Sequence, residues 1–142
     1  MIQNKDWRAI SVLLWEYLVA SKEQPLLFYS SVAQQMGIHP RHVNYPLIYI
    51  LEFCERHHLP ALSGLVISKD QYQNQGVRKP GSGFRIKHQD QFYFPDSFQF
   101  DEYYQRELNQ IRATDWTSVR YEPCQLSHSR LKKHLSQQKM RQ

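Results

Sequence analysis

Helix-breaking residues divide the first 60 positions of the chain into short segments. Four of them are prolines and one is a glycine: Pro25, Gly37, Pro40, Pro46 and Pro60. Proline has no backbone N–H and clashes with the preceding helical turn, whereas glycine favours the left-handed conformation in which helices end. This part of the chain is therefore predicted to form short helices joined by tight turns.

The segment before the first proline has the strongest helical pattern. Apolar residues recur three and four positions apart between Asp6 and about Ser21, which places them on one side of a helix. This row consists of Trp7, Ile10, Leu14, Tyr17 and Leu18. The row is widened by Val12, Leu13, Trp15 and Val19. We therefore expect this helix to be buried around much of its circumference.

Two further helices are predicted between Pro25 and Pro60. The first covers 29–37, with a serine as its N-terminal cap and Gly37 as its C-terminal stop. Its apolar face consists of Val32, Ala33 and Met36. Pro46 either starts the second helix or kinks it; we favour a start, with a short turn or helix at 39–45 and a main helix from Pro46 to near Pro60. Its apolar row is Val43, Leu47, Ile50, Leu51 and Cys54.

After Pro60 the pattern changes from helix to strand. The β-branched run at 64–68 predicts a buried strand, and alternation at 84–87 predicts a second one that 91–94 extends. Between them, 69–83 has the composition of a loop. A helix is predicted from Asp96 or Ser97 to about Ala113, followed by an anchor at Asp115-Trp116. Its buried side is expected to carry Phe100, Tyr103, Tyr104, Leu108 and Ile111.

This order of elements is typical of a winged helix-turn-helix, in which one helix enters a DNA groove and a basic loop contacts the backbone. We therefore predict an α+β fold. A winged-helix-like domain with a small β-sheet and a C-terminal helix covers 1–123, and a basic extension covers 124–142. A length of 142 residues suits one such domain.

The net charge of +5 is distributed unevenly along the chain. Residues 124–142 contain five basic residues and no acidic one, and 69–88 contain five basic residues against Asp70. In contrast, 89–122 contain seven acidic residues and three arginines. We therefore expect an anion-binding side and an acidic side. The acidic helix at 97–113 and the basic extension are also candidate surfaces for a protein partner.

Two groups of side chains suit a nucleic-acid binder. Arg41, His42 and Asn44 lie at the start of the candidate recognition helix, where base edges are contacted. The predicted wing supplies cations that would neutralise phosphates: Lys69, Arg78, Lys79, Arg85 and Lys87. We therefore expect a non-enzymatic protein that binds nucleic acid, duplex DNA in preference to RNA.

The stretch from Phe28 to Phe84 also resembles a known family. The resemblance rests on Tyr29-Ser30-Ser31-Val32-Ala33 with Gly37, on Leu59-Pro60, on Leu65-Val66-Ile67, and on Pro80-Gly81-Ser82-Gly83-Phe84. These motifs are similar to those of the DNA-binding domain of alkylguanine-DNA alkyltransferases and alkyltransferase-like proteins. They are also similar to uncharacterised bacterial domains with a later Asp-Trp, here Asp115-Trp116.

The resemblance implies a winged-helix fold and DNA binding, but not the family's chemistry. Alkyltransferases follow the proline with a Cys-His-Arg nucleophile motif, whereas Ala61-Leu62-Ser63 follows Pro60 here. The family's own pattern therefore excludes alkyl transfer to a cysteine at this position, and we assign no catalytic residue.

Two other functions remain open. A small nuclease-type toxin or defence-related effector would use His88, Lys87, Arg85 and Tyr93 for acid–base work and charge stabilisation. A protein-interaction adaptor would use the acidic helix or the basic extension. Binding to bare nucleic acid, cleavage of it, or neither would distinguish the three.

The two cysteines do not suggest a metal site. Cys54 and His57 have a Cys-x-x-His spacing, but Cys54 lies on the predicted apolar row and is interpreted as a small core residue. We expect neither a metal nor another cofactor. No apolar run approaches the roughly 20 residues of a membrane span, and no signal-peptide pattern is present. The expected location is therefore the cytoplasm.

Overall fold

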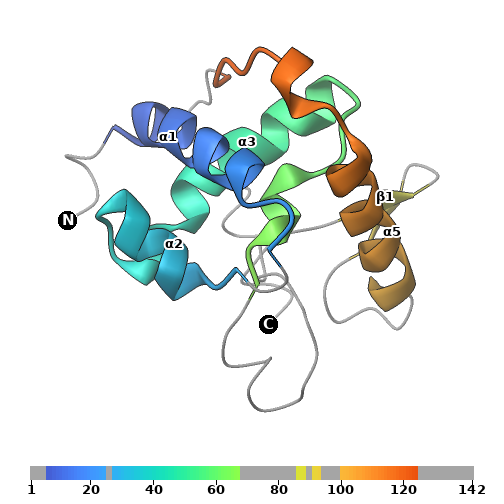
Figure 1. The fold of residues 1–142 in the computed structure, drawn as a ribbon, viewed down its shortest axis with the longest axis horizontal. Coiled ribbons are helices and arrows are strands. Elements are labelled where there is room, and N and C mark those ends of the chain that lie inside the picture. Colours follow the sequence, from blue (N-terminus) through green and yellow to red (C-terminus); the bar gives the residue numbers. More distant parts are fainter. Residues whose placement is uncertain (1–5, 25–26, 68–85, 89–90, 94–99, 125–142) are drawn as a thin grey trace.

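The computed structural model describes residues 6–24, 27–67, 86–88, 91–93 and 100–124, with side chains at 6–24, 27–67 and 101–124 (Figure 1). Its helices and strands are α1 (Trp7–Ala20), α2 (Tyr29–Met36), η1 (Pro40–His42), α3 (Asn44–Arg56), η2 (Leu62–Leu65), β1 (Ile86–His88), β2 (Gln91–Tyr93), α5 (Phe100–Ala113) and η3 (Trp116–Ser118). The η elements are short 3-10 helices. No helix in these ranges is long and apolar enough to cross a membrane.

The first helix begins and ends where the sequence predicts. The carboxylate of Asp6 accepts a hydrogen bond from the Ala9 N–H (3.1 Å) and so caps α1. Its inner side is buried, but Val12 and Leu13 are 36% and 59% exposed. The expectation that α1 is buried around much of its circumference is therefore wrong for this side.

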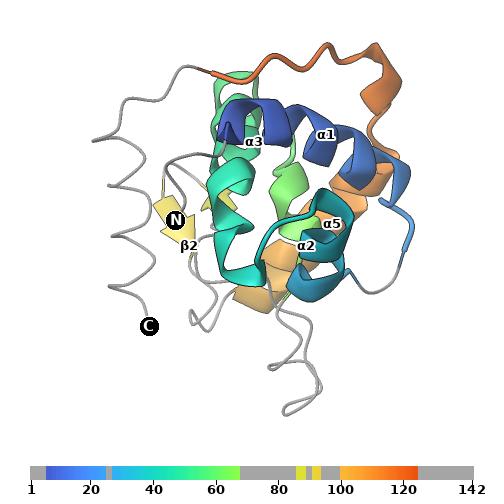
Figure 2. The same ribbon diagram turned by 90° about the vertical axis from the view of Figure 1, so that its left-hand side faces the viewer.

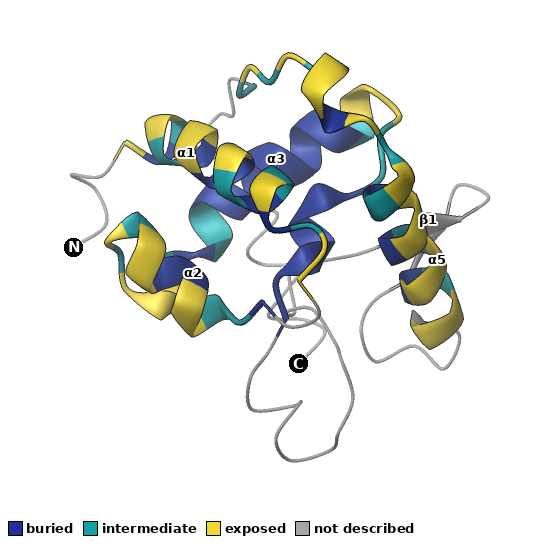
Figure 3. Cartoon of the chain, viewed as in Figure 1, coloured by how far each residue is buried: buried dark blue, intermediate teal, exposed yellow. Residues whose placement is uncertain are grey.

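The central helix of the fold is α3. Every residue from Pro46 to Cys54 is buried, and α1, η1 and η2 all pack against this helix (Figures 1 and 3). It begins at Asn44, two residues before the predicted start. Pro46 is tolerated there because the N–H groups of the first turn have no partner inside the helix.

The predicted strand at 64–68 is not formed. Residues 62–65 are the 3-10 helix η2, which packs between α3 and α5. Among the described residues of this run, only Ile67 forms a β-bridge, a single parallel one to Phe28. A short buried apolar run does not distinguish strand from helix by its periodicity, and burial between two helices decides the outcome here.

The predicted fold class is therefore wrong. The described part of the chain is helical, and the α+β winged-helix class with a β-sheet does not apply to it. β1 and β2 are segments of three residues that pair only with each other among the described residues, antiparallel, with Lys87 opposite Phe92. The predicted loop at 69–83 and the basic extension beyond Cys124 lie outside the described residues, so the boundary near 123 stays a prediction.

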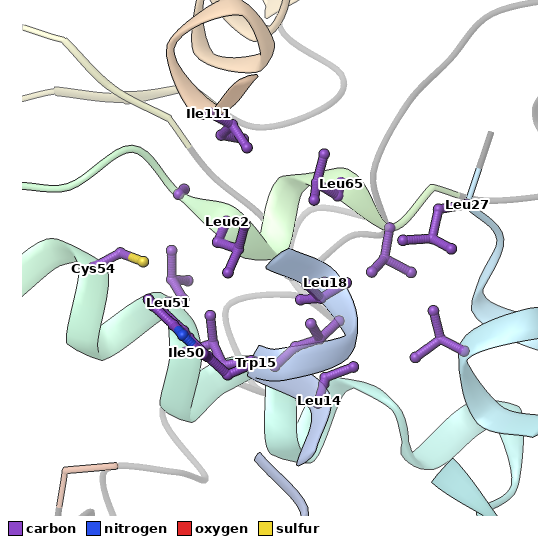
Figure 4. Packing of buried hydrophobic residues seen from close by; sticks show 14 of the residues in the cluster. Leu14, Trp15, Leu18, Leu27, Ile50, Leu51, Cys54, Leu62, Leu65 and Ile111 are labelled. Atoms are coloured by element: carbon purple, nitrogen blue, oxygen red, sulfur yellow. The ribbon is translucent and has the colours of Figure 1, made fainter. Parts of the chain in front are cut away.

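The core lies between α1, α3, η2 and α5 (Figure 4). Leu14, Trp15 and Leu18 come from α1, and Ile50, Leu51 and Cys54 come from α3. Leu62 and Leu65 of η2 and Ile111 of α5 close it on the other side. On α5, Tyr104, Leu108 and Ile111 are buried as predicted, and the Tyr104 hydroxyl donates to the Gly64 carbonyl (2.7 Å).

Two basic side chains join the ends of α1 and α5. The Lys22 ammonium donates to the carbonyls of Arg112 and Thr114, at 3.1 and 3.2 Å, and Arg112 Nε donates to the Lys22 carbonyl (3.3 Å). Carbonyls at the ends of helices have no helical partner, and cations near them are stabilising. Both charges therefore serve the fold.

A second link runs from the C-terminal segment back to α1. The indole ring of Trp116 packs edge-on against Trp15, and its N–H donates to the Ile111 carbonyl (2.7 Å). Tyr121 stacks on Trp15, with ring centroids 4.5 Å apart, and its hydroxyl donates to Ser11 Oγ (2.9 Å). We call residues 116–124 the strap (Figure 2).

Both α2 and α3 end in the same hydrogen-bonded motif, but with different residues. After α2, Gly37 has φ +69, and the Ile38 N–H bonds to the Ala33 carbonyl (3.0 Å). After α3, the left-handed residue is His58, with φ +55. A residue with a Cβ is strained in this conformation, whereas glycine is not.

The substitution His58→Gly is therefore expected to raise the free energy of unfolding by about 0.5–1 kcal/mol. Urea denaturation monitored by tryptophan fluorescence measures the change. Gly37→Ala is the matched control and should lower stability by a similar amount, since a Cβ at Gly37 would contact nothing within 4 Å and only the backbone term changes. Equal stability of His58→Gly and the parent would contradict the strain argument.

Candidate nucleic-acid interface

The predicted groove-reading residues lie where α1, α2 and α3 meet. Arg41 is exposed on η1, and His42 and Asn44 are half-buried at the end of η1 and the start of α3. His39 caps η1, because its Nδ1 accepts a hydrogen bond from the Arg41 N–H (3.2 Å). The backbone that carries Arg41 is therefore held in one conformation by its neighbour.

Aromatic side chains fix this turn to the first residue of α1. Trp7 stacks on Tyr45 with ring centroids 5.2 Å apart and meets His42 edge-on at 5.8 Å. His42 in turn lies 5.8 Å from the ring of His39 and 6.0 Å from that of Tyr45. We call Trp7 with residues 39–45 the η1 corner.

Arg41 differs from the other basic side chains of the described residues. Three of them donate to backbone carbonyls: Arg8, Lys22 and Arg112. Three pair with carboxylates: Arg56 with Glu52, Arg106 with Glu102, and Arg120 with Glu122. Within the described ranges, the Arg41 guanidinium alone has neither a hydrogen bond nor an ion pair. Its donors are therefore free to bind an anion from solution.

The burial of α3 limits which of its residues a nucleic acid could contact at the η1 corner. Pro46–Cys54 is covered on all sides, so a ligand reaches only the first turn of this helix. Trp7 is 8% exposed and already stacked on Tyr45, so it supports the turn and offers no open face for a base. The chemistry of the corner suits a phosphate contact better than insertion of a helix into a groove.

The remaining predicted contacts lie mostly outside the described residues. Lys87 is the middle residue of β1, where only the backbone is described. Lys69, Arg78, Lys79 and Arg85 fall outside the described ranges. The structure therefore brings Arg41, His42 and Asn44 together and does not place the predicted wing relative to them.

Charge is divided between the described body and the rest of the chain. The described side chains include seven basic and ten acidic residues, whereas the remaining positions contain eleven basic and three acidic ones. The net positive charge therefore comes from segments other than the helical body. A polyanion would be attracted mainly by the charge of those segments.

The alternative catalytic set is not gathered by the β1–β2 pair. Lys87 and His88 are consecutive residues of β1, so they fall on opposite faces of the ribbon. Tyr93 pairs with Ile86 and shares a face with His88, while Arg85 lies outside the described residues. A nuclease that needs all four groups around one phosphate is not supported by this register.

Cys54 is a core residue, as its spacing predicts. Its thiol is fully buried, and burial raises its pKa to about 12 although the Leu62 N–H donates to the sulfur. His57 packs on the ring of Phe53, with centroids 4.3 Å apart. In the ranges with described side chains, no three histidine, cysteine, aspartate or glutamate residues are close enough to hold a metal ion.

The two thiols are expected to react at very different rates with iodoacetamide at pH 8. The thiolate is the nucleophile in this reaction. The Cys54 thiol is buried and its pKa of about 12 lies far above pH 8, so very little thiolate forms there. Cys124 is half-exposed and therefore accessible to the reagent. Mass spectrometry of the native protein should therefore show one modified cysteine, at Cys124, and two only after denaturation. Cys124→Ser is the control and should leave the native protein unmodified; rapid modification of Cys54 in that variant would contradict its burial.

The residue that follows Pro60 has a structural role. The buried Ala61 N–H donates to Glu107 Oε1 (3.3 Å), which joins η2 to α5. Desolvation by burial raises the pKa of the Glu107 carboxyl, and the hydrogen bond partly offsets it. This is the position at which the alkyltransferase motif would place its nucleophile.

The sequence predicts Arg41, His42 and Asn44 as contact residues but does not indicate which residues hold their turn in place. Trp7, His39 and Tyr45 complete the η1 corner, and the contact of Trp7 with 42 and 45 spans more than thirty positions. Tyr45, three residues after His42, is the one local signal for this cluster. Comparison of the chain with known protein families, curated proteins and solved structures found no match.

Proposed function

We propose that this protein binds nucleic acid, duplex DNA in preference to single strands or RNA, without acting on it chemically. The observation that carries the proposal is the unpaired, exposed guanidinium of Arg41 on a turn held by His39 and by stacked aromatic rings. Because the backbone of this turn is already held, binding a phosphate at Arg41 does not have to order it, which lowers the entropy cost of the contact.

The charge distribution supports the same function. Arg41 alone would bind one phosphate weakly, because exposed ion pairs contribute about 0–1 kcal/mol. The eleven basic residues outside the described side chains would supply the remaining contacts, each releasing counterions from the polyanion. We therefore propose that the η1 corner sets the position of the nucleic acid and that the basic segments supply most of the affinity.

Fluorescence anisotropy over a salt series tests the proposal, with labelled duplex DNA, single-stranded DNA and RNA as probes. Arg41→Ala should lower affinity for duplex DNA several-fold and reduce the slope of log K against log salt by about 1. The quadruple variant of Arg78, Lys79, Arg85 and Lys87 to alanine should lower affinity further and reduce the slope by up to about 4.

Arg106→Ala is the matched control, because Arg106 is exposed but paired with Glu102 on α5 (3.3 Å). Its affinity should equal that of the parent. Equal losses in Arg41→Ala and Arg106→Ala would remove the η1 corner from the proposal, and absence of binding to all three probes would overturn it. Cleaved probe on a denaturing gel would favour the nuclease alternative instead.

A further inference from the structure

The outward side of α1 carries few polar groups. Its exposed residues are Ala9, Val12, Leu13, Glu16 and Ala20, and Ile10 and Tyr17 are half-buried beside them. Figure 3 shows these exposed and intermediate positions along the side of α1 that is turned away from α3. Helices that are apolar on all sides are normally covered on all sides, so the chain as described leaves this side without its expected cover.

The spacing of these residues suits a helix as the covering element. Ile10, Leu13, Tyr17 and Ala20 follow one another at intervals of three, four and three, which forms a straight apolar row along α1. We call this row the outer seam. Glu16 borders the seam, and Glu23 is exposed in the turn that follows α1.

The size of the outer seam argues against an independent partner or a second copy. From Ile10 to Ala20 it is about 15 Å long. Stable complexes bury about 800 Å² on each partner, which a strip of one short helix does not provide. A segment tethered to the same chain needs far less contact area, because tethering gives an effective concentration in the millimolar range.

The strap fixes the start of such a segment beside α1. Arg8 Nη2 donates to the Pro123 carbonyl (2.8 Å) and Arg8 Nε to the Cys124 carbonyl (3.4 Å). The chain therefore leaves the described body next to the first turn of α1, with 18 residues still to follow. Six extended residues span about 20 Å, enough to cross the width of a helix.

The sequence of that segment complements the outer seam. Residues 125–142 contain five basic residues and no acidic one, whereas the exposed charges along α1 and its flanking turns are Asp6, Glu16 and Glu23. Leu131 and Leu135 are four positions apart, the spacing of neighbours on one side of a helix. Apolar residues with basic neighbours therefore match an apolar seam with acidic neighbours.

We propose that residues 130–139 dock on the outer seam of α1 in the same molecule, as a basic amphipathic helix whose cations lie beside Glu16. This inference does not depend on nucleic-acid binding. It gives α1 a second buried side and assigns the basic extension a binding site on the body of its own chain.

Paramagnetic relaxation enhancement on the full-length chain tests the proposal. A nitroxide is attached through Ser136→Cys in a Cys124→Ser background, in which Cys54 is buried and does not compete for the label. The methyl resonances of Val12 and Leu13 and the amide resonance of Glu16 should broaden. Mixing isotope-labelled chains without nitroxide with unlabelled chains that carry it should give no broadening.

Two further variants identify the contacts. Leu13→Gln should remove most of the broadening, and Glu16→Lys should reduce it at least two-fold; Ser31→Gln, at an exposed position of α2, should leave it unchanged. Absence of broadening on α1 would overturn the proposal, as would broadening that both seam variants retain. Broadening of α1 in the mixed sample as well would also overturn it, because the occupant would then belong to a second copy.

Discussion

Replacing Trp15 with alanine is expected to lower the free energy of unfolding by about 3–5 kcal/mol. Trp15 is 6% exposed and lies at the junction of three segments that are distant in sequence. Its indole stacks on Tyr121 of the strap and meets Phe53 of α3 and Trp116 edge-on, with centroids 5.4 Å away in both cases. Such a loss is a large fraction of the 5–15 kcal/mol by which domains of this size are stable.

Urea denaturation followed by far-UV circular dichroism measures this change without depending on the tryptophan that is removed. Gln35→Ala is the control, because Gln35 is exposed on α2 and lies outside both the core and the outer seam, and it should change stability by less than about 0.5 kcal/mol. A loss below about 1 kcal/mol for Trp15→Ala would show that the strap does not pack on α1 as described.

The helices of the N-terminal half were predictable because their signals are local. Asp6, Gly37 and the row from Val43 to Cys54 each act within a few positions of the chain, through a cap, a left-handed stop and a helical repeat. Pro46 shifted the predicted start of α3 by two residues, because a proline is accepted at several positions of a first turn.

The features that could not be predicted depend on contacts between distant segments. The run at 64–68 has the β-branched composition of a strand, but η2 forms there because it is packed between α3 and α5. Likewise, the sequence of α1 contains apolar residues on all sides and does not say that Leu13 stays outside the described core.

The candidate site likewise has features that local sequence signals predict and features that depend on contacts between distant segments. A basic residue at position 41 before a helical pattern was enough to nominate Arg41. Which arginines are paired depends on where the carboxylates lie in three dimensions. The structure shows that Arg56, Arg106 and Arg120 are paired and that the Arg41 guanidinium is not. Burial of α3 on all sides, which limits groove insertion, also depends on its neighbours rather than on its own apolar row.

Two serine-to-alanine substitutions are expected to change stability in opposite directions. Ser11 and Ser63 are both buried, but their hydroxyls are in different situations. Ser11 Oγ donates to the Arg8 carbonyl (2.6 Å) and accepts from the Tyr121 hydroxyl (2.9 Å). Ser63 Oγ has no hydrogen-bond partner within the described part of the chain.

A buried hydroxyl without a partner costs about 1–3 kcal/mol, and removing one partner of a buried pair costs a similar amount. Ser63→Ala should therefore raise the free energy of unfolding by about 1–2 kcal/mol, and Ser11→Ala should lower it by about 1–3 kcal/mol, since Tyr121 is then left unpaired. Both variants replace a serine by an alanine, so the effects of the substitution on the unfolded chain are the same and cancel in the comparison. Urea denaturation of the two variants and the parent measures the difference, and destabilisation of equal size in both would show that Ser63 has a partner after all.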